Sequence, residues 1–404
     1  MSIRDETEVS LMGTALKDRD QDLIETKYSK HGVLPLLVLY GANASGKSNV
    51  LHALRMFRNM VASSFKMTGK TLPYDPFELD ESSGEKPTKF AIDFIHNEVR
   101  YQYGFTYDAT QIHQEWLYAF PKQAQQLWFH RDKNNKSIDY GRSLSGSNKS
   151  VENVTKKDVL FLSTAHASGH KQLDEIYNFV CDKIFFLSRK KPLSDIFEEL
   201  HKDPNLKSRT EEFLRHADTG VVNIQTEERP NEPSETLTEF YGFMSKVIDA
   251  EMKPPATTFE GKLGHLAQSG GTKALKFETE SSGTRELMIL VPAIVKALSS
   301  GSIVILDEIT TTLHTLLSRN IITLFADKKS NPRGAQLLFS THDTNLLNDK
   351  VLRRDEIWFS EKSRDGASVV YPLVEIPTKN TDNIEKGYIQ GRFGAIPYIS
   401  EEYR

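Results

Sequence analysis

The chain has very little cysteine and no long apolar run. Cys181 is the one cysteine among its 404 residues, which excludes an intrachain disulfide and a zinc site built from several cysteine ligands. No segment approaches the roughly 18 consecutive apolar residues that suggest a membrane span, and residues 1–30 lack the apolar core of a secretory signal. We therefore expect a cytoplasmic protein that does not itself span a membrane.

An excess of positive charge is also absent. The formal net charge is −4 at pH 7, which argues against a broadly basic nucleic-acid binder but leaves room for a local basic patch. A hydrophobic content of 38% and a charged content of 26% are typical of globular proteins. With 404 residues, the chain is long enough for two domains or for one large, elaborated domain.

The stretch Leu36–Leu54 reads LLVLYGANASGKSNVLHAL, an apolar strand, a glycine-bearing turn and a helix-forming segment. It fits the phosphate-loop pattern G-x-x-x-x-G-K-[ST], in which backbone N–H groups surround an anion at the start of a helix. In this interpretation Lys47 reaches the β- and γ-phosphates of ATP and is catalytic, and the Ser48 hydroxyl is a ligand of Mg²⁺. A chance match in a loop is the alternative, but the preceding strand and following helix argue against it. The predicted nucleotide-binding residues here are Gly41, Asn43, Ala44, Ser45, Gly46, Lys47, Ser48 and Asn49.

A second short apolar strand, Ile303–Leu306, ends in two acidic residues, Asp307 and Glu308. Downstream of a phosphate loop, such a pair predicts that the aspartate holds Mg²⁺ and that the glutamate orients and deprotonates the attacking water. An acidic pair at a strand end without such a role is the alternative. We therefore predict Asp307 as a metal ligand and Glu308 as a catalytic base.

Two further segments have residues that could contact the same nucleotide. The sequence ESSGT begins a helix, so Ser281, Ser282 and Gly283 can present a helix N-terminus to a phosphate, although a plain helix cap would have the same pattern. Leu337–Ser340 is another apolar strand, and His342 follows it where a side chain can reach the γ-phosphate. We predict His342 as a third catalytic residue, although a lone histidine is often structural.

Alternation with a period of two predicts an antiparallel β meander after the phosphate-loop helix. Phe90, Ile92 and Phe94 share one face, and the aromatic residues between Val99 and Tyr107 share another. The tyrosines could stack on bases, but packing within a sheet is our interpretation because alternating aromatic residues are ordinary strand material.

Helical spacing is found at Lys171–Phe186, Pro192–Ala217 and Ser234–Ala250, and Lys253–Gly271 is interpreted as an irregular connection. Heptads are not sustained, which excludes long coiled-coil arms. The predicted boundaries are 1–189 for an N-terminal part with the phosphate loop and the meander, 190–253 for a small helical insertion, and 254–404 for a C-terminal part that completes the nucleotide-binding unit.

Together these motifs resemble those of the ABC-type ATPases, in the branch that includes the RecF and SMC proteins. GANASGKSN is similar to their phosphate loop, ESSGT to their signature, VILDE to their Walker B strand, TTLH to their D-loop and STHD to their histidine switch. The chain resembles more closely the compact AAA-family ATPases found as the AbiL and RloA components of bacterial restriction and abortive-infection loci. That resemblance extends to the segments ADTGV, RRDEIWF and GYIQGRFGAIP. These relatives usually carry a proline where this chain has Thr315.

The resemblance implies an α/β fold, namely an ABC-type P-loop NTPase head with a leading antiparallel β meander and a small helical insertion. It also implies ATP and Mg²⁺ as cofactors, and a homodimer or higher oligomer in which two protomers enclose ATP. The helix N-terminus at Ser281–Gly283 would then complete the charge clamp across a two-fold axis. Arg353, Arg354 and Arg392 are interpreted as surface, interface or tail-packing residues.

Two functions fit this resemblance. The first is an ATPase that dimerises around ATP and controls a separate, nuclease-like effector protein in anti-phage defence (abortive infection). The second is a RecF- or SMC-like ATPase of DNA repair or recombination that clamps DNA itself, and nucleic acid is a possible partner. Some relatives carry a Toprim nuclease after the ATPase, but too few residues follow His342 for such a domain, so we expect the effector to be another chain.

Overall fold

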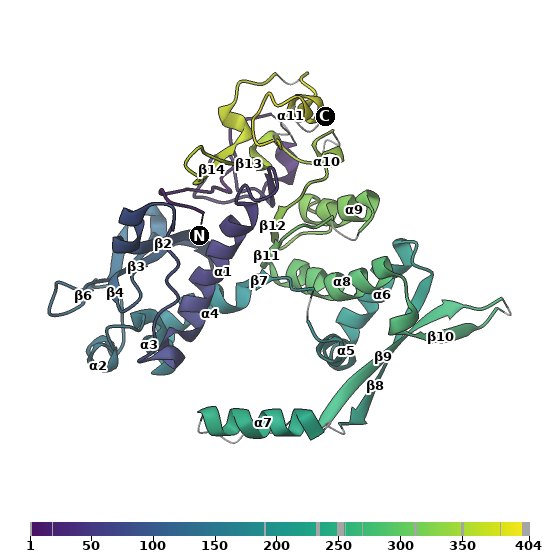
Figure 1. Ribbon diagram of the computed structural model, residues 1–404, viewed down its shortest axis with the longest axis horizontal. Coiled ribbons are helices and arrows are strands. Elements are labelled where there is room, and N and C mark those ends of the chain that lie inside the picture. The colour runs from purple at the N-terminus through teal and green to yellow at the C-terminus, as the bar shows by residue number, and fades with distance from the viewer. Residues whose placement is uncertain are drawn as a thin grey trace. The chain divides into compact units, whose positions relative to one another are not determined.

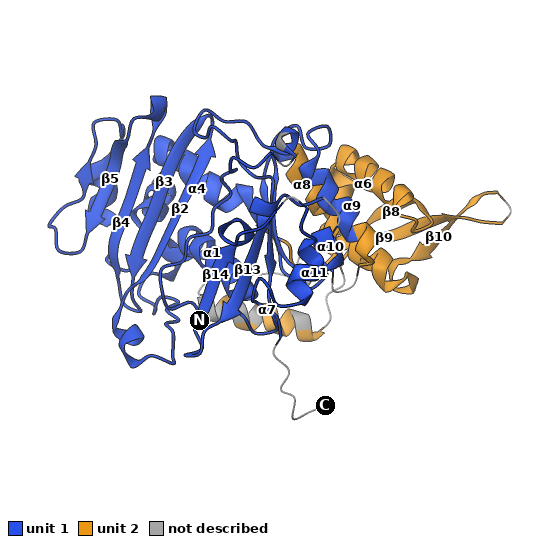
Figure 2. Cartoon of the chain, turned by 90° about the horizontal axis from the view of Figure 1, so that it is seen from above, with its two compact units in different colours: residues 1–186, 300–310, 318–404 blue, residues 187–299, 311–317 orange. Residues whose placement is uncertain are grey.

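The computed structural model describes residues 2–17, 19–189, 191–231, 235–248, 254, 256–268, 270–310, 313–348, 351–379 and 381–397. The chain divides into two units (Figures 1 and 2). Unit 1 comprises residues 1–186, 300–310 and 318–404, and unit 2 comprises residues 187–299 and 311–317. The predicted insertion, 190–253, therefore falls inside a larger unit. It is also not wholly helical, because Val221–Pro230 within it forms a strand.

Unit 1 is built on a six-stranded sheet with the strand order β14-β13-β1-β12-β11-β7. β14 is antiparallel to β13, and all other neighbouring pairs are parallel. Because the central strands are parallel, their carboxyl ends meet at one edge, where ligands of such sheets bind. The strands are β1 (Leu36–Tyr40), β7 (Ile184–Phe186), β11 (Ile303–Leu306), β12 (Gln336–Ser340), β13 (Ile357–Lys362) and β14 (Ser368–Pro372).

All five residues of β1, LLVLY, are buried, as expected for a parallel strand that is covered on both faces. β1 leads directly into the phosphate-loop turn and then α1 (Lys47–Ser63). The other helices of this part of the chain are α9 (Thr315–Ala326), which crosses the boundary between the units, α10 (Asn345–Asn348) and α11 (Ile384–Ile389).

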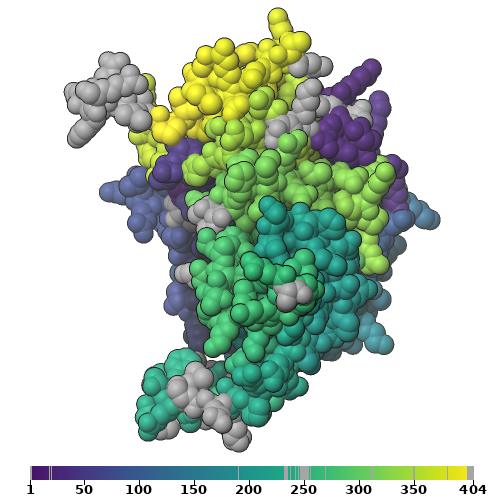
Figure 3. Space-filling model, turned by 90° about the vertical axis from the view of Figure 1, so that its right-hand side faces the viewer, coloured from purple at the N-terminus to yellow at the C-terminus, as the bar shows by residue number. Residues whose placement is uncertain are grey.

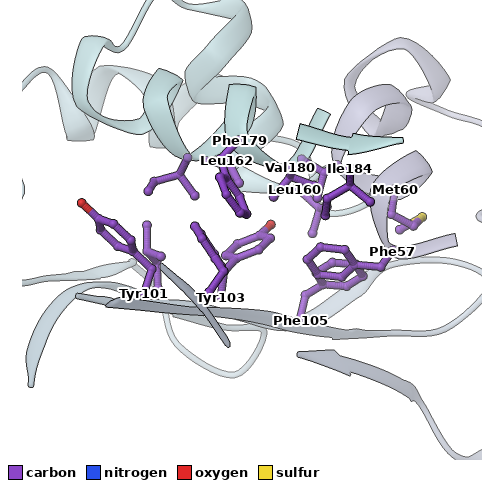
Figure 4. Packing of buried hydrophobic residues seen from close by; sticks show 14 of the residues in the cluster. Phe57, Met60, Tyr101, Tyr103, Phe105, Leu160, Leu162, Phe179, Val180 and Ile184 are labelled. Atoms are coloured by element: carbon purple, nitrogen blue, oxygen red, sulfur yellow. The ribbon is translucent and has the colours of Figure 1, made fainter. Parts of the chain in front are cut away.

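The predicted meander forms a second, five-stranded antiparallel sheet in unit 1, ordered β2-β3-β4-β5-β6. Its inner face packs against α1 and three further helices (Figure 4). Tyr103, Phe105 and Tyr107 are fully buried, and the ring of Phe105 stacks on that of Phe57 at 5.5 Å. Sheet packing of the tyrosines is therefore confirmed. The elements are β2 (Thr88–His96), β3 (Val99–Tyr107), β4 (Ile112–Ala119), β5 (Gln126–Asp132), β6 (Asp139–Tyr140), α2 (Asn148–Val154), α3 (Phe161–Ala167) and α4 (Lys171–Lys183).

One helix prediction in unit 1 is wrong at its end. The helix expected at Lys171–Phe186 stops at Lys183, and Ile184–Phe186 forms β7, which pairs in parallel with β11. The three residues Ile-Phe-Phe suit either a buried helix turn or a strand. The partner strand, which lies more than a hundred residues away in the sequence, decides between them.

Unit 2 combines helices with a three-stranded antiparallel sheet ordered β10-β9-β8. The predicted helices are present, although the predicted ends Ser234 and Ala250 lie outside the described residues. α7 lies at the end of the β8–β9 ribbon that is opposite the turn between β9 and β10 (Figures 1 and 3). The elements are α5 (Leu193–Lys202), α6 (Pro204–His216), β8 (Val221–Pro230), α7 (Glu235–Ile248), β9 (Thr257–Leu266), β10 (Thr272–Lys276) and α8 (Ser282–Ser300).

The irregular connection predicted at Lys253–Gly271 is wrong, because β9 occupies most of it and pairs with strands on both sides. Its two glycines weaken the local strand signal. Both lie where packing is tight: a β-carbon at Gly261 would lie 2.0 Å from the ring of Phe197, and one at Gly264 would lie 2.3 Å from Asn223 Oδ1. In the part of the chain that the structure describes, no helix has both the length and the apolar character needed to cross a membrane.

Candidate nucleotide-binding site

The turn between β1 and α1 has the local geometry of an anion cradle. Gly46 precedes the first residue of α1 with a left-handed φ of 111°, and no side chain caps this helix N-terminus. A β-carbon at Gly46 would lie 2.0 Å from Ser368 Oγ, so only glycine fits there. The first N–H groups of a 17-residue helix are therefore not taken by a side-chain cap, which suits them to bind a phosphate.

Lys47 is 5% exposed, and its ammonium group lies inside the curve of the loop. Its Nζ donates hydrogen bonds to the carbonyl oxygens of Gly41 at 2.8 Å and Ala42 at 2.9 Å. Burial lowers the pKa of Lys47, while the carboxylates of Glu308 and Asp307 oppose that shift. The ammonium is held where it can exchange the loop carbonyls for phosphate oxygens.

The acidic pair follows β11 at the same edge of the sheet, and Ser340 at the end of β12 holds both residues. The Ser340 hydroxyl donates to Asp307 Oδ1 and accepts the Glu308 N–H at 2.8 Å. Glu308 has a left-handed φ of 55°, a conformation that residues other than glycine rarely adopt. The Ile309 N–H donates to the Ser340 carbonyl at 3.1 Å, so β12 fixes this turn and with it the direction of the Glu308 side chain.

His342 Nε2 lies 3.8 Å from Glu308 Oε1. Burial lowers the pKa of His342, the charge of Lys47 lowers it further, and the two carboxylates oppose these effects. The imidazole is therefore mainly neutral at pH 7. β12 pairs with β1 on one side and with β11 on the other, so the fold brings Lys47, Glu308 and His342 to one edge of the sheet.

The predicted magnesium ligands have the right chemistry for that ion. Ser48 and Asp307 are both exposed and offer a hydroxyl and a carboxylate oxygen, the hard donors that Mg²⁺ prefers. Among the described residues, no group of three or more His, Cys, Asp or Glu side chains could hold a metal ion. A site of this kind fits Mg²⁺, which is commonly held by one or two protein ligands together with substrate phosphates.

The predicted signature lies in unit 2, at the start of the 19-residue helix α8. Ser281 Oγ accepts the Thr284 N–H at 3.1 Å and caps the helix. Ser281 and Ser282 are exposed. A β-carbon at Gly283 would meet no atom nearer than Ser281 Oγ, at 3.9 Å, so packing within the chain does not require this glycine.

Three serines near the site escaped the sequence analysis. Ser340 is the first residue of the STHD motif, and that position was the available signal. Ser360 and Ser368 both donate hydrogen bonds to the Ser45 carbonyl of the phosphate loop. They lie in β13 and β14, and no local pattern marks them.

The RRDEIWF and tail segments are structural in unit 1. Arg353 is 1% exposed and makes a two-pronged ion pair with Asp355, at 2.9 and 3.0 Å. Arg392 lies 3.0 Å from Asp382 within the C-terminal part of the unit. Arg353 is therefore an interior residue and Arg392 packs the tail, whereas Thr311 and Thr312 of the D-loop lie outside the described residues.

Comparisons with known proteins found similar solved structures. The chain is similar to the Smc head bound to the C-winged helix domain of ScpA, with 14% identity over 85% of this chain and 92% of that chain and a TM-score of 0.42. It is also similar to the SMC head domain from Thermotoga maritima, with 11% identity over 83% and 89% of the two chains and a TM-score of 0.37. No curated protein matches its sequence.

A family model described as "AAA domain, putative AbiEii toxin, Type IV TA system" matches residues 36–348. The match begins at the strand before the phosphate loop and ends shortly after His342, so it includes every motif of the candidate site. Because it spans well over half of the 404 residues, the chain belongs to this family of AAA-domain proteins.

Proposed function

We propose that the protein binds ATP and Mg²⁺ between two copies of itself, hydrolyses the ATP, and controls a separate effector protein in bacterial anti-phage defence. The observation that carries the proposal is the convergence of Lys47, Glu308 and His342 at the carboxyl ends of three adjacent strands. These side chains come from distant parts of the sequence, and each has the chemistry that phosphoryl transfer to water requires.

Each group has a distinct proposed task. The uncapped N-terminus of α1 and the Lys47 ammonium bind the terminal phosphates. Ser48 and Asp307 hold Mg²⁺, which supplies neutralisation of phosphate charge when it is bound. Glu308 orients the attacking water and accepts its proton, and the neutral His342 lies beside it to contact the γ-phosphate.

The exposed N-terminus of α8 supports a site shared between protomers. A helix N-terminus attracts anions, and at Gly283 the surface is open, since an added β-carbon would meet nothing nearer than 3.9 Å. In a two-fold dimer, Ser281–Gly283 of one protomer faces the phosphate loop of the other and completes the charge clamp around the γ-phosphate.

The family description, which names an AbiEii toxin and a type IV toxin–antitoxin system, supports a role in defence. Direct DNA clamping has less support, because the tyrosines that could have stacked on bases are buried in the meander. Controlling an effector also requires an interaction that changes with the nucleotide state. Coexpression with the products of adjacent genes should therefore yield a complex whose stability differs between the wild type and Glu308→Gln.

The shared site can be tested by mixing two inactive variants. Lys47→Ala removes the phosphate-binding cation, and Gly283→Asp places a carboxylate against the γ-phosphate, so each variant should be inactive alone. In a mixed dimer, one composite site combines the intact loop of one chain with the intact signature of the other. Equal mixing should restore roughly a quarter of wild-type turnover, because half of the dimers are mixed and each has one intact site.

A second mixture provides the control. Wild-type chains are paired with chains that carry both substitutions, and mixed dimers are isolated through two different affinity tags. Each composite site then has one defect, so turnover should remain at background. Activity in these dimers would place the complete site within one protomer and would contradict the proposal.

A further inference from the structure

Two buried hydroxyl groups converge on one carbonyl oxygen of the phosphate loop. Ser360 Oγ, in β13, donates to the Ser45 carbonyl at 3.0 Å, and Ser368 Oγ, in β14, donates to the same oxygen at 2.7 Å. Ser360 is 0% exposed and Ser368 is 5% exposed. Both lie in the antiparallel hairpin at the edge of the main sheet and contribute nothing to the predicted catalytic set.

Because the peptide unit is planar, these contacts also fix the direction of an N–H group. The described backbone contains no cis peptide bond, and in a planar trans peptide the C=O and the following N–H point in opposite directions. The Ser45 carbonyl shares its peptide unit with the Gly46 N–H. Hydrogen bonds that hold the carbonyl toward β13 and β14 therefore hold the Gly46 N–H toward the opposite side, where the anion cradle opens.

The second hydroxyl belongs to a longer chain of hydrogen bonds. Asn49 Nδ2 lies 2.6 Å from Ser2 Oγ, and Ser2 Oγ lies 2.6 Å from Ser368 Oγ. Because Ser368 gives its only hydroxyl proton to the Ser45 carbonyl, it must accept from Ser2, and Ser2 in turn accepts from Asn49. Protons are thus donated in one direction from Asn49 to Ser45, which strengthens each bond in the series.

This series begins and ends in the phosphate-loop segment. Asn49 lies in the first turn of α1, and Ser45 lies in the loop before it. The Ser368 N–H also donates to the Ser2 carbonyl at 2.7 Å, which fixes Ser2 against β14. At the start of the loop, a β-carbon at Gly41 would lie 2.2 Å from the Ser360 carbonyl, so β13 supports both ends of the turn.

We propose that Ser360 and Ser368 are positioning residues for nucleotide binding, which orient the Ser45–Gly46 peptide so that its N–H meets a phosphate of ATP, and that Ser2 and Asn49 orient Ser368. This inference rests on the proposed function, because it concerns the same phosphate site. The four side chains act through the loop backbone, so their effect is on affinity for the nucleotide rather than on the proton transfer at Glu308.

The test measures ATP affinity by calorimetry and turnover under saturating ATP. Ser360→Ala and Ser368→Ala should each weaken ATP binding about fivefold, and the double variant about twentyfold, as expected for lost hydrogen bonds of this kind. The kcat should stay within twofold of wild type, whereas the melting temperature without nucleotide should fall modestly, because the buried Ser45 carbonyl loses a hydrogen bond in each single variant and both in the double variant. Ser363→Ala is the matched control, since that serine lies in the same hairpin turn and bonds within it; it should leave ATP affinity unchanged.

The possible results separate this inference from the proposed function. Wild-type affinity in the folded double variant would overturn the positioning role while leaving ATP binding by Lys47 intact. A wild-type protein that binds no ATP would overturn both. If the double variant fails to fold, Ser2→Ala replaces it, because this change leaves both strand serines in place. It should weaken ATP binding about twofold, and an unchanged affinity would then contradict the inference.

Discussion

The phosphate-loop region of unit 1 and the β8–β10 sheet of unit 2 obtain their shapes in different ways. β1 is a short strand of five buried residues between two parallel neighbours, and the turn after it is held by hydrogen bonds to its backbone. β9 is longer and half exposed, and it is held by pairing on both sides and by close packing of Phe197 on Gly261.

The sequences of these two regions are constrained in different ways. In the phosphate loop, backbone N–H groups must face a ligand, so the loop needs particular residues at particular positions. In β9, the strand must fit its neighbours, so it needs space at the two glycines and apolar side chains at the buried positions Phe259 and Leu263. Substitutions should therefore affect ligand binding in the first region and stability in the second.

The largest expected effect is that of Lys47→Ala on ATP binding. The loop would lose the Lys47 ammonium that bonds to its carbonyls, and charge-assisted bonds to phosphate are among the strongest in proteins. We expect affinity for ATP and Mg²⁺ to fall by roughly a hundredfold or more, with little change in stability, because Lys47 Nζ bonds only to loop carbonyls among the contacts described. Near-normal affinity in calorimetry would remove the basis of the phosphate-loop assignment.

The same contrast explains what could be predicted from the sequence. The fold class followed from the family resemblance that the motifs carry, and the site residues lie in short segments whose glycines, lysine and acidic pair are recognisable on their own. Ser360 and Ser368 could not be found in this way, because they lie 315 and 323 residues from the Ser45 carbonyl that they bind. β7 and β9 were missed for a related reason: their partner strands define them, and a local pattern contains no information about a partner.

Gly261→Ala should have the next largest effect, on stability. The added methyl group would lie 2.0 Å from the ring of Phe197, and a clash of this kind in a packed interior costs about 1–3 kcal/mol. Urea unfolding should therefore detect an earlier transition, while ATP affinity stays within twofold of wild type. Gly270→Ala tests whether any glycine substitution in unit 2 lowers stability. A β-carbon there would meet nothing within 4 Å, so this variant has no clash, but its φ of 81° adds backbone strain. A large loss of ATP affinity in Gly261→Ala would show that the two regions are coupled.

A smaller, pH-dependent effect is expected at Glu356, which is 1% exposed and accepts the Arg353 N–H at 2.7 Å. Burial raises the pKa of its carboxyl group to about 8. Between the usual glutamate pKa and 8, the folded state therefore holds a proton that the unfolded state has lost, so this group's contribution to the unfolding free energy falls as pH rises.

The glutamine introduced by Glu356→Gln cannot ionise. This variant should therefore not show the fall in unfolding free energy that Glu356 causes as pH rises. Its unfolding free energy relative to wild type should increase between pH 5.5 and 7.5, by at most about 1.4 kcal/mol per pH unit. Denaturant unfolding at three pH values in this range measures the trend. The exposed Glu375→Gln serves as the matched change, and a difference that is constant with pH in Glu356→Gln would contradict the raised pKa.

The smallest effect should come from α7, where Phe240 is 55% exposed and Phe243 is 63% exposed. Replacing both with serine removes little buried apolar surface, so the unfolding free energy should change by less than about 0.5 kcal/mol and ATP affinity should not change. Phe197→Ser is the matched control, because that ring is 3% exposed on α5 and its loss should cost about 3–5 kcal/mol. A comparable loss in the α7 variant would mean that α7 is stabilised by packing of these rings. The region would then depend on tertiary burial as β9 does, rather than on its own helical sequence.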